Sequence, residues 1–93
     1  MIITGRSVTN EFKKKHADAR SSIDAWEAEA EDASWTQPSN IKQRYADASF
    51  LPGNKVVFNI KGNKYRLLVQ VNYKNKIVLI EKAGTHNEYM KWG

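Results

Sequence analysis

The sequence contains no cysteine, only two prolines and no long run of apolar residues. Without cysteine there can be neither a disulfide framework nor a thiolate zinc site, and such a composition is typical of a reducing compartment. Without a long apolar run no helix could span a membrane, and residues 1–3 are too short for the apolar core of a signal peptide. We therefore expect a cytoplasmic protein without a membrane partner, folded as one domain over residues 1–93.

Acidic residues are scarce in the second half of the chain. Residues 48–93 contain eight lysines and arginines but only two acidic residues, a net charge of +6, whereas residues 1–47 have a net charge of −1. A region this basic attracts polyanions and steers them in at low salt. The same charge could serve solubility alone, but in so small a basic domain it favours nucleic acid binding.

Apolar side chains recur at steps of three and four residues in the first third of the chain. This spacing predicts one amphipathic helix of about six turns, with Ser7 as its N-terminal cap. The apolar stripe consists of Val8, Phe12, His16, Ala19, Ile23, Trp26 and Ala30. We expect Trp26 in the core, His16 at the core edge rather than in a site, and the acids from Asp18 to Asp32 on an exposed acidic back. A shorter helix capped by Ser39 and Asn40 should follow.

The period changes to two after a turn at residues 52–54, which predicts strands. Residues 56–60 and 65–73 alternate, and residues 77–80 are apolar on both faces, as in a central strand. Gly62-Asn63 and Lys74-Asn75 predict tight hairpin turns. We expect an α+β fold in which an N-terminal strand and two helices pack on a C-terminal antiparallel meander. The other sheet face is either solvated or a binding surface, and it carries Lys64, Arg66, Gln70 and Asn72.

The segment 86–92 brings together a histidine, a tyrosine, a lysine and a tryptophan. Thr85-His86-Asn87-Glu88 has the spacing of a capping box, which places His86 in the first turn of a short helix, where free amides can hold an anion. A capping box followed by an exposed histidine also occurs by chance. Together with the basic strands, however, these residues suit cleavage of RNA by its own 2′-hydroxyl, which needs an acid, a base and cations. Two histidines and few acids in the basic half predict no metal site and no cofactor.

The run VVFNIKGNKYRL at 56–67, followed by GTHNEY at 84–89, resembles the HigB family of type II toxin–antitoxin toxins. The resemblance extends from the opening strand to near the C-terminus. It implies a RelE-like fold and ribosome-dependent cleavage of mRNA. It also implies a helix-turn-helix antitoxin, similar to HigA, that neutralises the toxin and brings it to operator DNA.

The charge pattern and the resemblance together select the candidate residues. The candidate catalytic residues are His86, Arg66, Lys64, Tyr89 and Lys82. His86 would give or take a proton, the cations would hold the phosphate, and Tyr89 would stack on or orient a nucleotide. The candidate RNA-binding residues are Lys55, Lys61, Lys74, Asn72 and Gln70. Two alternatives stay open: a non-catalytic RNA- or ribosome-binding module neutralised by an antitoxin, and an interaction protein that acts only through its antitoxin complex.

Overall fold

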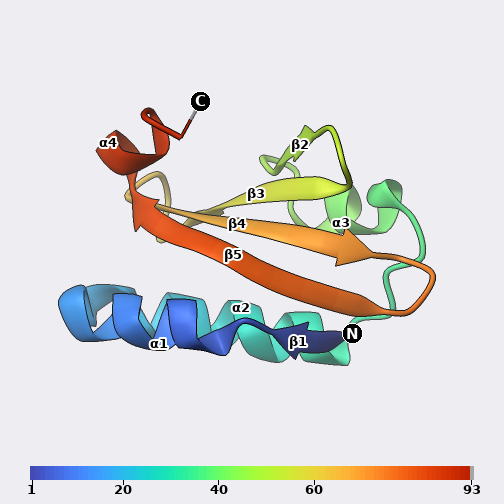
Figure 1. Ribbon diagram of the computed structural model, residues 1–93, viewed down its shortest axis with the longest axis horizontal. Coiled ribbons are helices and arrows are strands. Elements are labelled where there is room, and N and C mark those ends of the chain that lie inside the picture. The colour runs from blue at the N-terminus through green and yellow to red at the C-terminus, as the bar shows by residue number, and fades with distance from the viewer. Residues whose placement is uncertain (93) are drawn as a thin grey trace.

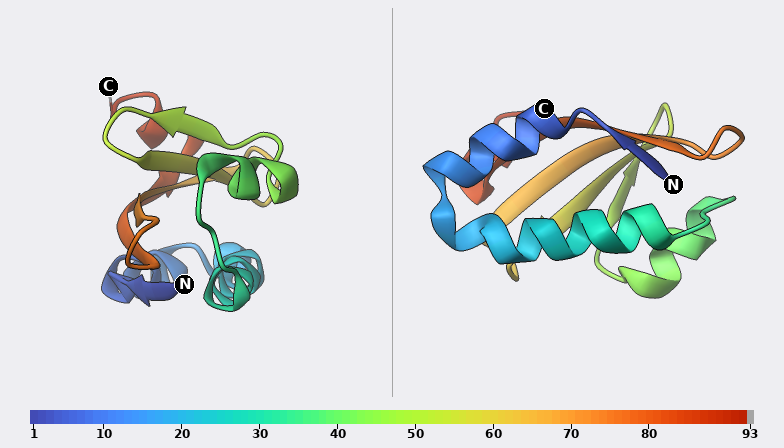
Figure 2. Two further views of the ribbon diagram at one scale, coloured as in Figure 1. Left: turned by 90° about the vertical axis from the view of Figure 1, so that its right-hand side faces the viewer. Right: turned by 90° about the horizontal axis from the view of Figure 1, so that it is seen from below.

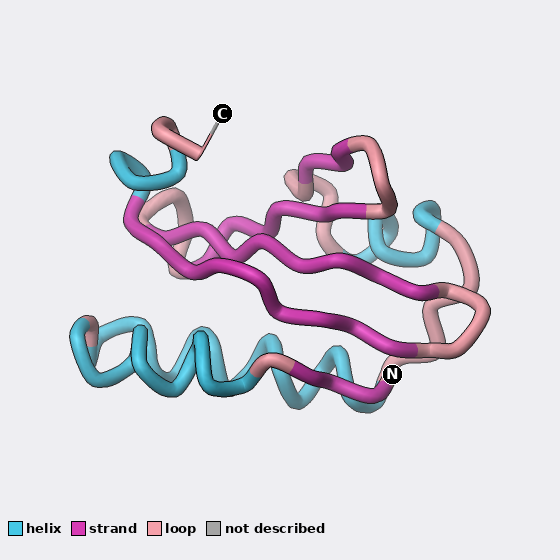
Figure 3. Tube along the Cα trace, viewed as in Figure 1, coloured by secondary structure: helices cyan, strands magenta, loops and turns pink. Residues whose placement is uncertain are grey.

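The computed structural model, which describes residues 1–92, contains a five-stranded sheet whose lower face in Figure 1 is covered by two helices. The tube in Figure 3 shows the same arrangement of helices and strands. In chain order the elements are β1 (Ile2–Thr4), α1 (Arg6–Lys15), a 3₁₀ turn (Ala17–Ala19), α2 (Arg20–Asp32), α3 (Pro38–Arg44), β2 (Ser49–Leu51), β3 (Lys55–Ile60), β4 (Tyr65–Asn72), β5 (Ile77–Thr85) and α4 (His86–Tyr89). The predicted α+β class is confirmed.

The sheet has the order β1-β5-β4-β3-β2. As predicted, β3, β4 and β5 form an antiparallel meander, and β1 completes one edge, where it pairs parallel with β5. The opposite edge is β2, a strand that the sequence reading missed and that pairs antiparallel with β3. The predicted central strand does lie inside the sheet, but β5 continues past Ile80 to Thr85 and thereby carries α4.

The core lies between the sheet and the pair α1 and α2, which run across the sheet face in opposite directions (Figure 2). Trp26 is 3% exposed, and its ring meets Phe58 edge-on at 5.2 Å between centroids. Trp35 is also buried and stacks on Phe58. His16 is half-buried and packs against the rings of Phe12 and Tyr65. The positions expected for Trp26 and His16 are therefore confirmed.

The prediction of a single six-turn helix is wrong. The chain leaves helical geometry at His16, with φ −129° and ψ 78°, and turns back through the 3₁₀ segment. A straight helix from residue 6 to residue 32 would be about 40 Å long. The longest strand has nine residues and spans about 30 Å. Folding the helix back lets both halves of the apolar stripe cover the sheet.

The predicted caps and turns also need correction. Gly5, not Ser7, precedes α1, and its positive φ of 79° brings the chain so close to Ile80 that a Cβ would lie 2.3 Å from the Ile80 carbonyl oxygen. Helix α3 begins at Pro38, and Asn40 caps it from inside by accepting the Gln37 amide at 3.2 Å. The two hairpin loops, 61–64 and 73–76, have four residues each rather than two.

The expected acidic back on α2 is largely paired. Glu27 is buried, where it bonds Arg6 and Thr9. Asp24 bonds Lys13 at 2.6 Å. The hydroxyl of Tyr45 donates to Glu29, which lowers the pKa of that carboxyl. Burial, followed by this hydrogen bond, raises the pKa of Tyr45. The acidic residues therefore tie α2 to α1 and α3 more than they form a free surface.

Within residues 1–92 no helix combines the length and the apolar character needed to cross a membrane.

The burial of Trp26 gives a test of the fold. Trp26→Ala should lower the free energy of unfolding by about 3–5 kcal/mol, because it leaves a large cavity beside Phe58. Trp26→Phe is the matched control, since the indole Nε1 has no hydrogen-bond partner within residues 1–92 and phenylalanine fills part of the same space. Urea denaturation measures both variants. If Trp26→Ala unfolds at nearly the parental urea concentration, the helix face is placed wrongly.

Candidate functional site

The predicted capping box is present at the end of β5. The Thr85 hydroxyl accepts the Glu88 amide at 3.2 Å, and the Glu88 carboxylate accepts the Thr85 amide at 2.8 Å. The Thr85 amide also lowers the pKa of the Glu88 carboxyl. The His86 amide donates to the Lys64 carbonyl at 3.1 Å, so the short helix α4 is attached to the β3–β4 loop. Because a helix of four residues is unstable alone, these contacts hold the turn in place.

Arg66 and His86 are in direct contact. Nη2 of Arg66 lies 3.1 Å from Nδ1 of His86, while Nη1 donates to the carbonyls of Asn63 at 2.8 Å and Tyr65 at 3.2 Å. A guanidinium group only donates hydrogen bonds, so Nδ1 of His86 is the acceptor in this contact. Arg66 is 8% exposed, whereas His86 is exposed. A held cation thus stands beside an accessible imidazole.

Two aromatic rings, Tyr89 and Trp92, pack in series beside Arg66 and leave His86 exposed. The Arg66 guanidinium lies 5.3 Å from the centre of the Tyr89 ring, and Tyr89 meets Trp92 edge-on at 5.7 Å. Trp92, whose role the sequence left open, packs against β5 at Gly84, where a Cβ would lie 2.8 Å from Cζ2 of the indole. The Lys82 ammonium lies 5.6 Å from the centre of the same indole ring. The structure therefore brings together Arg66, Lys82, His86 and Tyr89.

A largely apolar pocket of about 310 Å³ opens beside the two rings. Its walls come from β2, β3, β4 and the C-terminal turn, and its lining residues are Leu51, Val57, Leu68, Tyr89, Met90 and Trp92. This pocket lies on the sheet face opposite α1 and α2, because Val57 and Leu68 are paired in the register and alternate with the core positions.

The backbone of Lys64 lies close to this cluster, but its side chain is bound elsewhere. Its ammonium bonds Asp18, which raises the pKa of the lysine and holds the pKa of the Asp18 carboxyl well below its usual range. Lys61 bonds the same carboxylate at 3.4 Å. Both lysines are therefore engaged within the protein, in contrast to the free basic groups expected from the sequence.

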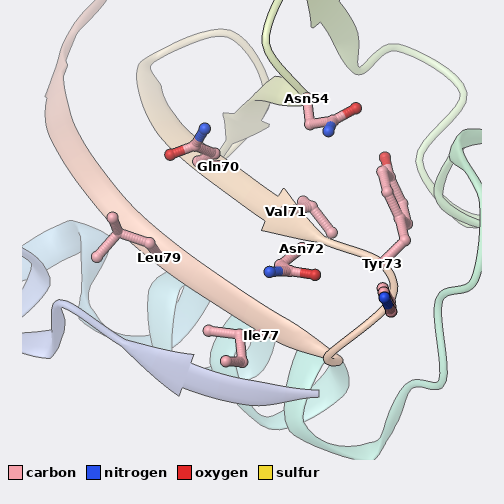
Figure 4. A pocket seen from close by; sticks show the side chains of 8 residues that line it. Asn54, Gln70, Val71, Asn72, Tyr73, Ile77 and Leu79 are labelled. Atoms are coloured by element: carbon pink, nitrogen blue, oxygen red, sulfur yellow. The ribbon is translucent and has the colours of Figure 1, made fainter.

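The other candidate RNA-binding residues lie elsewhere on the sheet. Lys55 pairs with Glu81 at 3.1 Å. Gln70, Asn72 and Lys74 line a separate open pocket of about 480 Å³ together with Asn54, Val71, Tyr73, Ile77 and Leu79 (Figure 4). By register this pocket is at the β4–β5 loop end, whereas Arg66 pairs with Gly84 at the other end. Arg66 and Asn72 are six positions apart along β4, a distance of about 20 Å.

Sequence reasoning missed Asp18, Gly84 and the β2 wall of the apolar pocket. Gly84 did have a local signal, since a glycine immediately before the capping box leaves room for a ring above the strand. Asp18 had none, because it lies 46 positions from Lys64. In the part of the chain that the structure describes, no three side chains of histidine, cysteine, aspartate or glutamate cluster as metal ligands.

A comparison with protein families matches residues 19–92 of the 93 to the model described as HigB_toxin, a RelE-like toxic component of a toxin-antitoxin system. The matched range contains every candidate site residue named from the sequence. The α+β architecture is consistent with this fold. No curated protein matches the chain significantly.

The packing of Trp92 on Gly84 can be tested directly. Gly84→Ala should undock the C-terminal turn, because the new methyl group would lie 2.8 Å from the indole and 3.1 Å from Cβ of Glu88. We expect the indole emission to shift to the red and the α4 amides to exchange about tenfold faster. Global stability should change little, since α4 is peripheral. The control introduces Gly84→Ala into a protein that already carries Trp92→Ala. If Gly84→Ala accelerates the exchange of the α4 amides equally in both proteins, the indole does not rest on Gly84.

Proposed function

The chain belongs to the HigB toxin family, the RelE-like toxic components of toxin–antitoxin systems, and we propose that it is a ribosome-dependent endoribonuclease that cleaves mRNA. The observation that supports this activity is the contact between Arg66 and His86 on the open sheet face. A fixed cation next to an exposed imidazole supplies charge stabilisation at phosphorus and one of the two proton transfers that metal-independent cleavage of RNA needs.

The proposed reaction is attack by the 2′-hydroxyl on the adjacent phosphorus. The 2′-oxygen bonds to phosphorus and its proton passes to a base, while the bond from phosphorus to the 5′-oxygen breaks and that oxygen takes up a proton. The products are a 2′,3′-cyclic phosphate and a free 5′-hydroxyl. His86 provides one of the two proton transfers, because it is the exposed imidazole beside the cation.

Arg66 is proposed to bind the phosphate through Nη2. Its Nη1 is fixed by the Asn63 and Tyr65 carbonyls, so the Nη2 edge is the part that can exchange its partner. A phosphoryl oxygen that binds Nη2 replaces the His86 ring as acceptor, and Nδ1 is then free to accept a proton. Lys82 is proposed to add positive charge from β5, since none of the salt bridges within residues 1–92 involves it.

The apolar pocket is proposed to hold a base next to the cleaved bond. Tyr89 and Trp92 offer ring faces and edges on which an unpaired base can stack, at about 1–3 kcal/mol per base. The open pocket lined by Gln70, Asn72 and Lys74 offers amide groups and a cation for RNA at the other end of the sheet. Lys55 is proposed to add positive charge although it pairs with Glu81, whereas Lys61 is held by Asp18.

Membership of the family implies an antitoxin partner. We propose that this antitoxin is a HigA-like helix-turn-helix protein, and that the toxin reaches operator DNA only in complex with it. The mRNA substrate would be presented by the ribosome, which places the activity in the cytoplasm.

A non-catalytic RNA- or ribosome-binding module is the second candidate function. The open pocket lined by Gln70, Asn72 and Lys74 favours it, because amides and a lysine at the end of the sheet far from His86 can bind RNA without taking part in proton transfer. In that case His86→Gln would inhibit translation as strongly as the parent protein. An interaction protein that acts only in its antitoxin complex would not affect growth when expressed alone.

The central test uses His86 and Arg66. His86→Ala should lower the single-turnover cleavage rate on mRNA-programmed ribosomes about 10²–10⁴-fold, while ribosome binding stays near the parental value. Arg66→Lys should already be damaging, because a lysine cannot reproduce three directed hydrogen bonds to Asn63, Tyr65 and the phosphate. The double variant should lose less than the product of the two single losses, since both groups act on one phosphoryl group.

Asn87→Ala is the control for these variants, because Asn87 is exposed and neighbours His86 in α4. It should cleave at nearly the parental rate and give the same 2′,3′-cyclic phosphate ends. Parental cleavage by His86→Ala would remove His86 from the mechanism and leave Tyr89 and the lysines as candidates.

The antitoxin should cover the basic face with an acidic segment. Lys74 is exposed and takes part in none of the salt bridges found in residues 1–92, whereas Lys55 is already paired with Glu81. We expect affinity for the antitoxin to fall at least about tenfold between low and high salt, and Lys74→Ala to reduce this dependence. Titration calorimetry across a salt series measures both. A salt-independent affinity would contradict an interface dominated by charge.

A further inference from the structure

We propose that Asp18 is a positioning residue for RNA cleavage: it anchors the β3–β4 loop, residues 61–64, whose backbone carbonyls hold Arg66 and His86 in contact. The inference rests on the proposed function, because it assigns Asp18 a role in the same reaction. It does not follow from the family match, which begins at residue 19.

The carboxylate of Asp18 meets three side chains, two from the β3–β4 loop and one from the start of β4. Oδ1 accepts the hydroxyl of Tyr65 at 2.6 Å, and Oδ2 accepts the ammonium groups of Lys61, at 3.4 Å, and Lys64. The Asp18 carbonyl accepts Lys61 as well, at 3.2 Å. One residue in the turn between α1 and α2 therefore holds the first and the last residue of the loop, Lys61 and Lys64, and also Tyr65, which directly follows the loop.

The loop in turn holds the two groups of the candidate site. The Asn63 carbonyl accepts Nη1 of Arg66 at 2.8 Å, and the Lys64 carbonyl accepts the amide of His86 at 3.1 Å. These two carbonyls belong to adjacent residues, so a rotation of the loop would move the guanidinium and the imidazole relative to each other. The position of the loop thus sets the separation of Arg66 and His86.

The loop has little support of its own. Lys61 and Gly62 both have positive φ, 53° and 64°, and the one backbone hydrogen bond that closes the loop runs from the Lys64 amide to the Lys61 carbonyl at 3.3 Å. All four loop residues are exposed. Asp18, by contrast, precedes Ala19, which is completely buried in the core. The anchor therefore connects an exposed loop to a turn that is packed into the core.

A role limited to stability is the alternative. Exposed ion pairs contribute little to folding, and the Asp18 side chain is 38% exposed, so its loss should leave the fold nearly intact. The anchor also occupies two lysines that would otherwise be free to bind phosphate. Loss of Asp18 should consequently have opposite effects on the two steps: slower cleavage, because the site is misaligned, but unchanged or tighter binding of RNA.

The experiment compares Asp18→Asn with the parent protein on mRNA-programmed ribosomes. Asparagine keeps an acceptor for Tyr65 but loses the charge that holds the lysines. We expect the single-turnover rate at saturation to fall about 10–100-fold, as for a small displacement of reacting groups. Affinity for the programmed ribosome should stay equal or rise. The slope of this affinity against salt concentration should steepen by the equivalent of up to about two phosphate contacts, because two lysines are released. Asp18→Glu should recover part of the rate.

Asp24→Asn is the matched control, because Asp24 is an exposed aspartate that pairs with Lys13, away from the loop. It should cleave and bind like the parent. Parental cleavage by Asp18→Asn, or a parallel loss of cleavage, binding and melting temperature, would overturn the proposal, since neither result is expected of a residue that positions the site.

A second measurement separates this proposal from the proposed activity. Hydrogen exchange of the His86 amide, which donates to Lys64, is measured on the protein without RNA. It should be about tenfold faster in Asp18→Asn and unchanged in Asp24→Asn. If the parent protein fails to cleave RNA but the exchange result holds, the activity is wrong and the anchor is right. Unchanged exchange in Asp18→Asn would show that the loop does not depend on Asp18.

Discussion

A guanidinium group with almost no solvent exposure needs acceptors around it, and at Arg66 this requirement organises the end of the sheet. Two of its acceptors are carbonyls at the β3–β4 turn, and the third is the imidazole of His86. Satisfying the charge therefore brings a loop, a strand and the short helix α4 to one point. The same contacts that pair the charge also leave an exposed histidine next to a fixed cation.

The fold separates stability from the proposed activity. Helices α1 and α2 cover one sheet face and bury Trp26, whereas the opposite face is left open for cations, aromatic rings and two pockets. The C-terminal turn belongs to the open side and is held by a capping box, by the Lys64 carbonyl and by the indole on Gly84. Changes in that turn should consequently affect activity more than folding.

The sequence predicted the meander strands and the cap of α4, which depend on local patterns, but its cap for α1 was wrong, because Gly5 is needed there for the close approach to Ile80. Alternation found the meander strands, and the Thr85 to Glu88 spacing found the capping box. It failed where geometry depends on distant parts of the chain. The helical spacing of apolar residues continues on both sides of the turn at His16, so the spacing could not predict that the helix ends there. Alternation predicts which face of the sheet a side chain lies on, but it does not predict which side chains lie close to the candidate site along the strands. The candidate RNA-binding residues accordingly lie at both ends of the sheet. The pairing of Lys61 and Lys64 with Asp18 depends on how the first helix pair turns back.

In the proposed reaction the RNA supplies its own nucleophile, while Arg66 and His86 assist. The most direct measurement is cleavage, by the parent protein, of an mRNA in which the single nucleotide on the 5′ side of the cut carries a 2′-deoxyribose. On programmed ribosomes this mRNA should bind as tightly as its all-ribose counterpart and remain uncut at that bond. Cleavage of the 2′-deoxy bond at the parental rate would contradict the account, because the nucleophile would then have to come from elsewhere.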